Sequence, residues 1–159
     1  NRKLSLDEFV TGPGETSLED GELVTGIECD SMTCYGSAFE KVGHRRSLVI
    51  STVCLAALVS LSDNGRQFED VRLALGGVGP VPVRLYESES CLLSKPVDTK
   101  LINKSADLAV KNVKSRTRQE YRREVVFNFV KRGIIEAIKD TDTNYAEVDT
   151  HIKPRKNYG

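Results

Sequence analysis

The chain has 159 residues, of which 39% are hydrophobic and 29% are charged. This length and composition are typical of one globular domain with a real core, and they exclude an intrinsically disordered protein. Lysines and arginines number 23, as do aspartates and glutamates, so the zero net charge gives no support to a general role at nucleic acids or membrane surfaces.

Residues 1–31 are predicted to form a strand, a loop and a second strand. Leu4, Leu6 and Phe9 lead into the turn residues TGPG at 11–14, and LVTGIEC at 23–29 forms the second strand. The first residues enter no apolar stretch of the kind that a secretion signal requires. They also do not start with methionine, which indicates a fragment or a processed piece.

The cysteines and histidines show no metal-binding spacing. No combination of them matches a zinc or iron–sulfur pattern. We therefore predict reduced structural thiols, a cytoplasmic protein and no metal site. The residues concerned are Cys29, Cys34, Cys54, Cys91, His44 and His151.

A short basic cluster precedes the most apolar part of the chain. It comprises Lys41, His44, Arg45 and Arg46. The more common arrangement is a solvated turn before a central strand. The alternative is an anion site, where these cations meet a phosphate or an electron-rich ring.

The most apolar run extends from Leu48 to Leu61 and predicts a buried strand. It is shorter than the about 20 apolar residues that span a bilayer, and it is rich in β-branched residues. Asp63-Asn64-Gly65 then predicts a tight hairpin turn. Apolar residues alternate with others through residues 71–75, which is the period of a half-buried strand, and GGVGPVP at 76–82 ends it. We predict a long antiparallel hairpin whose apolar face the rest of the chain covers.

Three helices are predicted after the hairpin. The first covers Tyr86 to Ser94, and the second is an amphipathic segment from Leu101 to Val113. The third follows a capping box from Thr117 to Glu120 and continues to about residue 139, with a polar tail beyond residue 140. Strands followed by helices predict an α+β fold, with an antiparallel sheet of three or four strands packed against about three helices.

The last helix also carries five basic residues, and these suggest a nucleic-acid interface. A solvated face on a core-facing helix is favoured instead, because the whole chain is neutral. The residues are Arg118, Arg122, Arg123, Lys131 and Arg132.

Catalytic motifs are absent from the sequence. It contains no nucleophile elbow, dinucleotide fingerprint, phosphate loop or paired-histidine metal motif, and no recognisable acid–base pair of carboxylates. On its residues alone, the chain is predicted to be a binding or interaction domain rather than a self-sufficient enzyme.

Four segments, in this order, carry a resemblance to a known family. They are FVTGPGETSLEDGELV (9–24), SAFEKVGHRR (37–46), VRLALGGVGPVPVR (71–84) and YRREVV (121–126). Together they resemble the C-terminal half of the FAD-binding subunit of molybdenum hydroxylases, the family of xanthine dehydrogenases, nicotinate dehydrogenase and carbon monoxide dehydrogenase. The resemblance implies three regions: the tail end of the FAD-binding domain (1–31), a CO dehydrogenase flavoprotein C-terminal domain (32–139) and a polar mobile tail (140–159).

The resemblance implies part of a multi-subunit oxidoreductase. In this family molybdopterin and [2Fe–2S] clusters lie on partner subunits, and electrons pass through FAD to NAD or another acceptor. The expected partners are an N-terminal FAD-binding half, an iron–sulfur subunit and a molybdopterin subunit, with neither nucleic acid nor a membrane. The alternative is a non-enzymatic interaction module that binds protein or RNA through its basic last helix; a steep salt dependence would distinguish it.

The resemblance also assigns two residues to the flavin. Leu23, within EDGELV, is expected to pack on the isoalloxazine ring, which favours aliphatic neighbours. Lys41, within AFEKVG, is expected to be the cation beside the cofactor, or Glu40 if the alignment shifts by one residue. Arg45 and Arg46 match a family Arg-Arg pair, which we assign to loop placement or a subunit contact. The family's phosphate-binding glycine loops belong to an N-terminal half, so we expect a partial FAD site, weak or no FAD binding and no activity for this chain alone.

Overall fold

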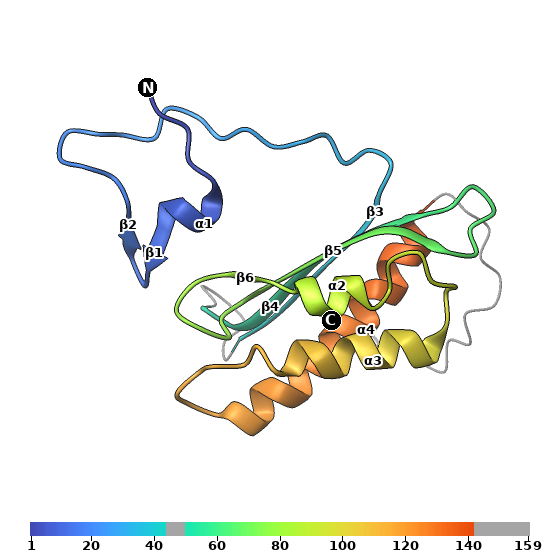
Figure 1. The fold of residues 1–159 in the computed structure, drawn as a ribbon. Coiled ribbons are helices and arrows are strands. Elements are labelled where there is room, and N and C mark those ends of the chain that lie inside the picture. Colours follow the sequence, from blue (N-terminus) through green and yellow to red (C-terminus); the bar gives the residue numbers. More distant parts are fainter. Residues whose placement is uncertain (44–49, 142–159) are drawn as a thin grey trace, which may run out of the picture.

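The structure is a computed structural model that describes residues 1–43 and 50–141. It contains two antiparallel sheets, a small one of order β1-β2 and a four-stranded one of order β3-β4-β5-β6. The elements are α1 (Leu6–Phe9), β1 (Val10–Gly12), β2 (Glu15–Thr16), β3 (Gly36–Gly43), β4 (Ser51–Leu61), β5 (Phe68–Gly76), β6 (Val83–Arg84), α2 (Tyr86–Ser90), α3 (Thr99–Val110) and α4 (Gln119–Asp140). Helices α2, α3 and α4 cover one face of the larger sheet (Figure 1). The predicted α+β fold is confirmed.

The central hairpin of β4 and β5 forms as its residue pattern predicts. Its register runs from Cys54 opposite Gly76 to Leu61 opposite Phe68. Alternate residues of both strands are buried, because one face of the sheet packs against the helices. The buried hydrophobic residues are Val53, Leu55, Ala57 and Val59 on β4, and Phe68, Val71, Leu73 and Leu75 on β5.

The turn of this hairpin is longer than predicted. Ser62 pairs with Gln67 (N to O, 3.0 Å), which leaves residues 63–66 as the loop. Within this loop only Gly65 has a positive φ, of 63°. The side-chain oxygen of Asn64 instead accepts hydrogen bonds from Ser62 Oγ (2.8 Å) and from the Arg66 amide (3.0 Å). Asn64 thus organises the loop through its side chain, and the hairpin turn forms at the predicted residues but is less tight than predicted.

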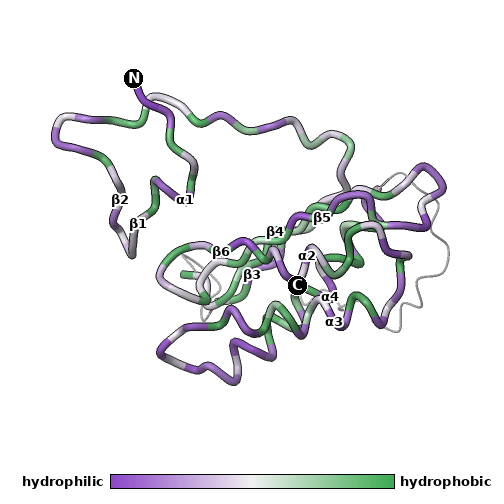
Figure 2. Tube along the Cα trace, in the orientation of Figure 1, coloured by the Kyte–Doolittle hydropathy of each residue, from purple (hydrophilic) through white to green (hydrophobic). Residues whose placement is uncertain are grey.

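The core lies between the sheet and helices α3 and α4. Hydrophobic and hydrophilic colours alternate along the strands and the helices, whereas the β4–β5 turn and the α3–α4 loop are mostly hydrophilic (Figure 2). The helix residues that complete the core include Ile102, Ala106 and Ala109 of α3, and Val126, Val130, Ile134 and Ile138 of α4.

Two helix boundaries differ from the prediction. Helix α4 has Arg118 as its N-cap, with a φ of 51° and no side-chain capping hydrogen bond, so the capping box at Thr117 is wrong. The Thr117 amide donates instead to Ser115 Oγ (3.4 Å), inside the preceding loop. Helix α2 ends at Ser90 rather than Ser94, because a turn follows it and Ser94 adopts a φ of 58°.

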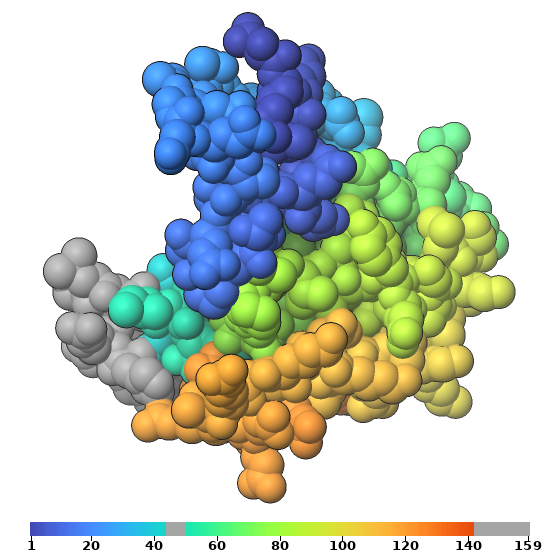
Figure 3. Space-filling view, turned by 60° about the vertical axis from the view of Figure 1, so that its left-hand side comes forward, coloured from blue at the N-terminus to red at the C-terminus, as the bar shows by residue number. Residues whose placement is uncertain are grey.

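The N-terminal segment, residues 1–31, differs most from the prediction. Residues 6–9 form the short helix α1, whose capping box joins Ser5 and Glu8. Residues 23–29 are not a strand, since no strand among the described residues offers its backbone to them. Within the described part of the chain, the hydrogen bonds of residues 1–31 all join two residues of that same segment. Figures 1 and 3 show the segment, in blue, standing out from the four-stranded sheet.

Strand β3 also differs from the prediction, because Lys41 lies within a strand, whereas a solvated turn was expected for the basic cluster. It pairs with β4 from Gly36 opposite Val59 to Gly43 opposite Ser51. The predicted cluster residues His44, Arg45 and Arg46, as well as His151 and the tail from residue 142, lie outside the described residues.

Candidate functional site

The sheet face opposite the helices, here called the open face, has small and apolar residues at its centre and polar residues around them. On this face, Ala56 of β4 lies between Phe39 of β3 and Ala74 of β5. Cys54 of β4 lies between Lys41 of β3 and Gly76 of β5. None of the helices covers this face (Figure 1), and the side chain of Phe39 is 68% exposed. Exposed aromatic surface over a floor of small residues is suited to a flat partner.

Lys41 lies on the open face, whereas Glu40 does not. Lys41 is exposed, and no ion pair is found for it within the described ranges. Glu40 faces α4, where its Oε2 accepts from Arg132 Nη2 at 2.6 Å, and Arg132 also stacks on the Phe129 ring. Glu40 is therefore held in a structural ion pair, and Lys41 is the residue whose charge remains available.

Leu23 is exposed on the connection between β2 and β3. Its fractional exposure is 73%, in a stretch without regular structure. Five other large apolar side chains of the N-terminal segment are at least 38% exposed; they are Leu4, Leu6, Leu18, Val24 and Ile27. The segment thus presents an apolar surface that its own residues do not bury.

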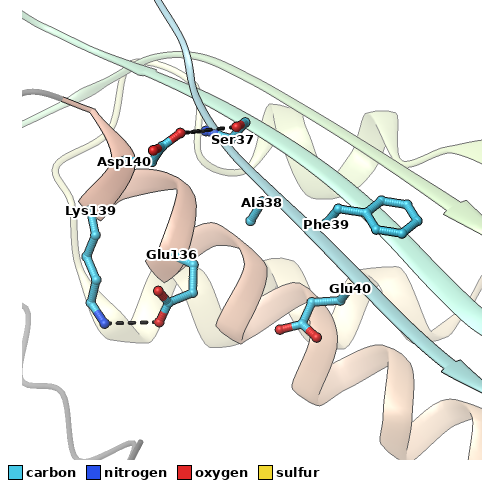
Figure 4. A pocket seen from close by; sticks show the side chains of 7 residues that line it. All are labelled: Ser37, Ala38, Phe39, Glu40, Glu136, Lys139 and Asp140. Atoms are coloured by element: carbon cyan, nitrogen blue, oxygen red, sulfur yellow. Dashed lines mark hydrogen bonds and ion pairs between the residues drawn. The ribbon is translucent and has the colours of Figure 1, made fainter. Parts of the chain in front are cut away.

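An open groove of about 410 Å³ lies between β3 and the end of α4, but neither Leu23 nor Lys41 lines it. Its polar groups are already engaged, as Figure 4 shows for the Glu136–Lys139 ion pair and for Asp140. The Asp140 carboxylate accepts from the Ser37 amide at 2.9 Å, and Phe39 points away from α4. The groove joins strand to helix, and it does not bring the two expected flavin residues together.

The residues present fit part of a flavin site. An exposed leucine can pack on an apolar ring, and an unpaired ammonium can face negative charge that develops on it. The groove described above includes neither Leu23 nor Lys41 in its lining. The described residues therefore supply the side-chain chemistry for one side of the site.

Tyr35, Asp70 and Arg72 form a polar cluster on the open face that the sequence did not single out. The Tyr35 hydroxyl donates to Asp70 Oδ2 at 2.5 Å, and Arg72 Nε donates to the same oxygen at 2.9 Å. The Arg72 guanidinium also lies 5.3 Å from the centre of the Tyr35 ring. The spacing of Asp70 and Arg72, two residues apart on one strand, was a usable signal, because such residues share a face.

Two of the basic residues of α4 form hydrogen bonds or ion pairs within the fold. Arg122 donates to the carbonyl oxygens of Thr52 and Gly77, and Arg132 pairs with Glu40.

Within residues 1–43 and 50–141, no helix is long and apolar enough to cross a membrane, and no group of three acidic, cysteine or histidine side chains could hold a metal ion.

The four cysteines are predicted to differ in reactivity. Cys29 and Cys34 are exposed, whereas burial raises the pKa of the half-buried Cys91 thiol. Because the thiolate is the reactive form, Cys91 is expected to be alkylated about tenfold more slowly than Cys29 by iodoacetamide at pH 8. Mass spectrometry of timed digests measures both rates. Equal rates at the two thiols would contradict the buried environment of Cys91.

Comparison with known proteins gives a consistent result. The family model of the CO dehydrogenase flavoprotein C-terminal domain matches residues 37–137. The chain is 29% identical over 143 residues to a xanthine dehydrogenase FAD-binding subunit of Escherichia coli O157:H7, covering 86% of this chain and 48% of the relative. It is 31% identical over 131 residues to the glyceraldehyde dehydrogenase medium chain of Sulfolobus acidocaldarius, covering 79% and 45%. The chain thus spans about half the length of the curated relatives it matches.

Solved structures share the fold. Quinoline 2-oxidoreductase from Pseudomonas putida 86 matches with a TM-score of 0.75 and 21% identity, covering 88% of this chain and 49% of that one. CO dehydrogenase from Oligotropha carboxidovorans matches with a TM-score of 0.72 and 23% identity, covering 84% and 47%. Both matches cover a larger share of this chain than residues 37–137 do.

Proposed function

Because the chain belongs to the family of the CO dehydrogenase flavoprotein C-terminal domain, we propose that it is the C-terminal part of the FAD-binding subunit of a xanthine-dehydrogenase-like molybdenum hydroxylase. Residues 1–31 are then the tail end of the FAD-binding domain, and residues 32–139 are the C-terminal domain. The bound FAD supplies electron transfer from [2Fe–2S] clusters to NAD or another acceptor. The clusters and molybdopterin belong to partner subunits.

The observation that carries this proposal is the uncovered apolar surface of the N-terminal segment. Six large apolar side chains between Leu4 and Ile27 are at least 38% exposed, and the open face presents Phe39 at 68%. A contiguous exposed apolar surface generally marks an interaction site. An N-terminal FAD-binding half that packs on this surface buries it and encloses the flavin.

Within the site, Leu23 would pack against the isoalloxazine ring, and Lys41 would be the cation that faces the negative charge of the reduced flavin. Lys41 suits this role because it is exposed on the open face, whereas Glu40 is engaged by Arg132. Arg45 and Arg46 place the following loop or contact a partner subunit. The chain alone binds FAD weakly or not at all, because the donors for the pyrophosphate belong to the N-terminal half.

The test of the proposal is a titration of FAD fluorescence with this chain, with a separately expressed N-terminal half from a relative, and with both together. Quenching is expected at micromolar concentrations only for the mixture. In the mixture, Leu23→Asp should weaken FAD binding about tenfold or more, since burial of a leucine contributes about 1.5–3 kcal/mol. Leu93→Asp is the matched control, because Leu93 is also exposed but lies on the helix side. Equal effects of the two variants would count against the site.

A second prediction concerns the flavin potential. In the reconstituted subunit, Lys41→Ala should lower the two-electron potential by about 30 mV, because the reduced flavin loses a nearby cation. Lys111→Ala is the control, since Lys111 is an exposed lysine at the end of α3. Spectroscopic redox titration measures both variants. An unchanged potential for Lys41→Ala would remove Lys41 from this role.

A further inference from the structure

We propose that Tyr35, Asp70 and Arg72 act as a latch that sets the direction in which residues 1–34 leave the sheet, and that these three are therefore positioning residues for the flavin site. The mechanical part of this inference depends only on the fold. Its consequence for the flavin rests on the proposed function, because Leu23 lies in the segment that the latch orients and Lys41 lies on the strand that follows it.

The latch spans three strands of the sheet. Gly36 pairs with Val59, so Tyr35 precedes the first paired residue of β3. The next residue along β4, Ser60, pairs with Asp70 of β5. Tyr35, Ser60 and Asp70 therefore lie in one row across the sheet, and the tyrosine side chain crosses the small residue Ser60 to reach the carboxylate of Asp70.

The latch is the point at which the N-terminal segment becomes attached to the sheet. Within the described ranges, no hydrogen bond joins residues 1–34 to any residue from 36 onward. The Tyr35 hydroxyl makes the first side-chain hydrogen bond to the sheet, over 35 residues of sequence separation. The segment can therefore hold a defined position relative to Lys41 only if the chain direction at Tyr35 is fixed.

Charge and stacking keep this latch closed at neutral pH. Burial alone would raise the pKa of Asp70, but hydrogen bonds from Tyr35 and Arg72 lower it overall, so the carboxylate is ionised. The hydrogen bond to Asp70 raises the pKa of Tyr35, so its hydroxyl remains a donor. Arg72 donates to the carboxylate and covers the tyrosine ring, and it thereby restricts both partners. Such charge-assisted hydrogen bonds are stronger than neutral ones.

The direct test is a spin-label distance measurement in the 159-residue chain. One label is attached to Cys29, and the other to the thiol introduced by Asp107→Cys on the exposed face of α3, with Cys34→Ser, Cys54→Ala and Cys91→Ala as background. Tyr35→Phe keeps the ring and removes the donor, so the distance distribution should widen about twofold. Asp70→Ala removes the acceptor and should widen it by a similar amount, which keeps the test valid if one variant folds poorly.

Tyr86→Phe is the matched control. Tyr86 also stacks against an arginine, Arg84, at 5.4 Å, and no hydrogen bond of its hydroxyl is found among the described residues. This control should leave the distribution unchanged. Widths for Tyr35→Phe and Asp70→Ala that equal the parent's would overturn the latch.

A second readout separates the latch from the flavin proposal. In the mixture with the N-terminal half, Tyr35→Phe should weaken FAD binding about tenfold, because the segment bearing Leu23 must then be ordered on binding. Unchanged FAD affinity in a variant with a widened distribution would overturn the positioning role alone. Absence of FAD binding in the parent mixture would overturn the proposed function, while the distance measurement would still decide the latch.

Discussion

Replacing Gly36 with alanine is expected to lower the free energy of unfolding by about 3 kcal/mol, at the upper end for overpacking. A Cβ atom at this position would collide with the carbonyl oxygen of Ala137 and would lie 2.7 Å from the Thr141 amide nitrogen. These are backbone atoms at the end of α4, so no side chain can rotate away. The same contact zone contains the hydrogen bond from the Ser37 amide to Asp140 (2.9 Å), which the displaced helix would lose.

Denaturant unfolding followed by circular dichroism measures this loss. Gly26→Ala is the matched control, because nothing lies within 4 Å of its Cβ position and its φ is not in the left-handed region. That control should change stability by less than about 0.5 kcal/mol. If the two variants had the same stability, the close packing of β3 against the end of α4 would be wrong.

Replacing Glu89 with alanine is expected to cost about 3 kcal/mol. Glu89 is 8% exposed, and its Oε1 accepts from the Leu73 amide at 2.7 Å and from Arg84 Nε at 2.5 Å. Alanine leaves a buried amide without a partner and the Arg84 charge without its counter-ion. The expected loss of stability is at the lower end of the range for broken buried ion pairs, because the Arg84 side chain is 34% exposed.

Two controls separate the contributions at this position. Glu89→Gln keeps an oxygen for the Leu73 amide and loses only the ion pair, so it should cost about half as much. Glu87→Ala, on the exposed side of the same helix, should be close to neutral. Equal losses for Glu89→Ala and Glu87→Ala would show that the buried carboxylate does not hold α2 against β5.

The hairpin could be predicted because its two strands pair with each other. The alternation of Val71, Leu73 and Leu75 is visible in the sequence, and the partner strand β4 lies next to it along the chain. Residues 23–29 also contain apolar residues, yet a strand needs a neighbour that offers its backbone, and none lies beside them in the part of the chain that the structure describes. Apolar content alone therefore overpredicted strands in the N-terminal segment.

Capping signals were ambiguous for a physical reason. Ser5-x-x-Glu8 and Thr117-x-x-Glu120 have the same pattern, and only the first forms a capping box. At the second position Arg118 adopts a left-handed conformation, which starts the helix one residue later. The backbone conformation of Arg118 depends on the path of the whole α3–α4 loop. The four residues of the capping pattern alone could therefore not predict where the helix begins.

The assignment of Leu23 and Lys41 to the flavin stays a prediction. Family resemblance pointed to Leu23 and Lys41, and both side chains are exposed, with Lys41 on the open face. The role of Tyr35 could not be found in the sequence, because its acceptor Asp70 is 35 residues away and two strands across. Such contacts depend on the order of the strands and on their register. The hydrophobic periodicity of a single segment indicates neither of these.

We propose that a flavin-binding half covers the N-terminal segment and the open face together. Amide hydrogen exchange, measured with and without that half and FAD, tests this arrangement. New protection is expected at residues 18–28 and 37–43, with exchange on α3 unchanged. Protection confined to α2 and α3, or no protection in either apolar region, would contradict it.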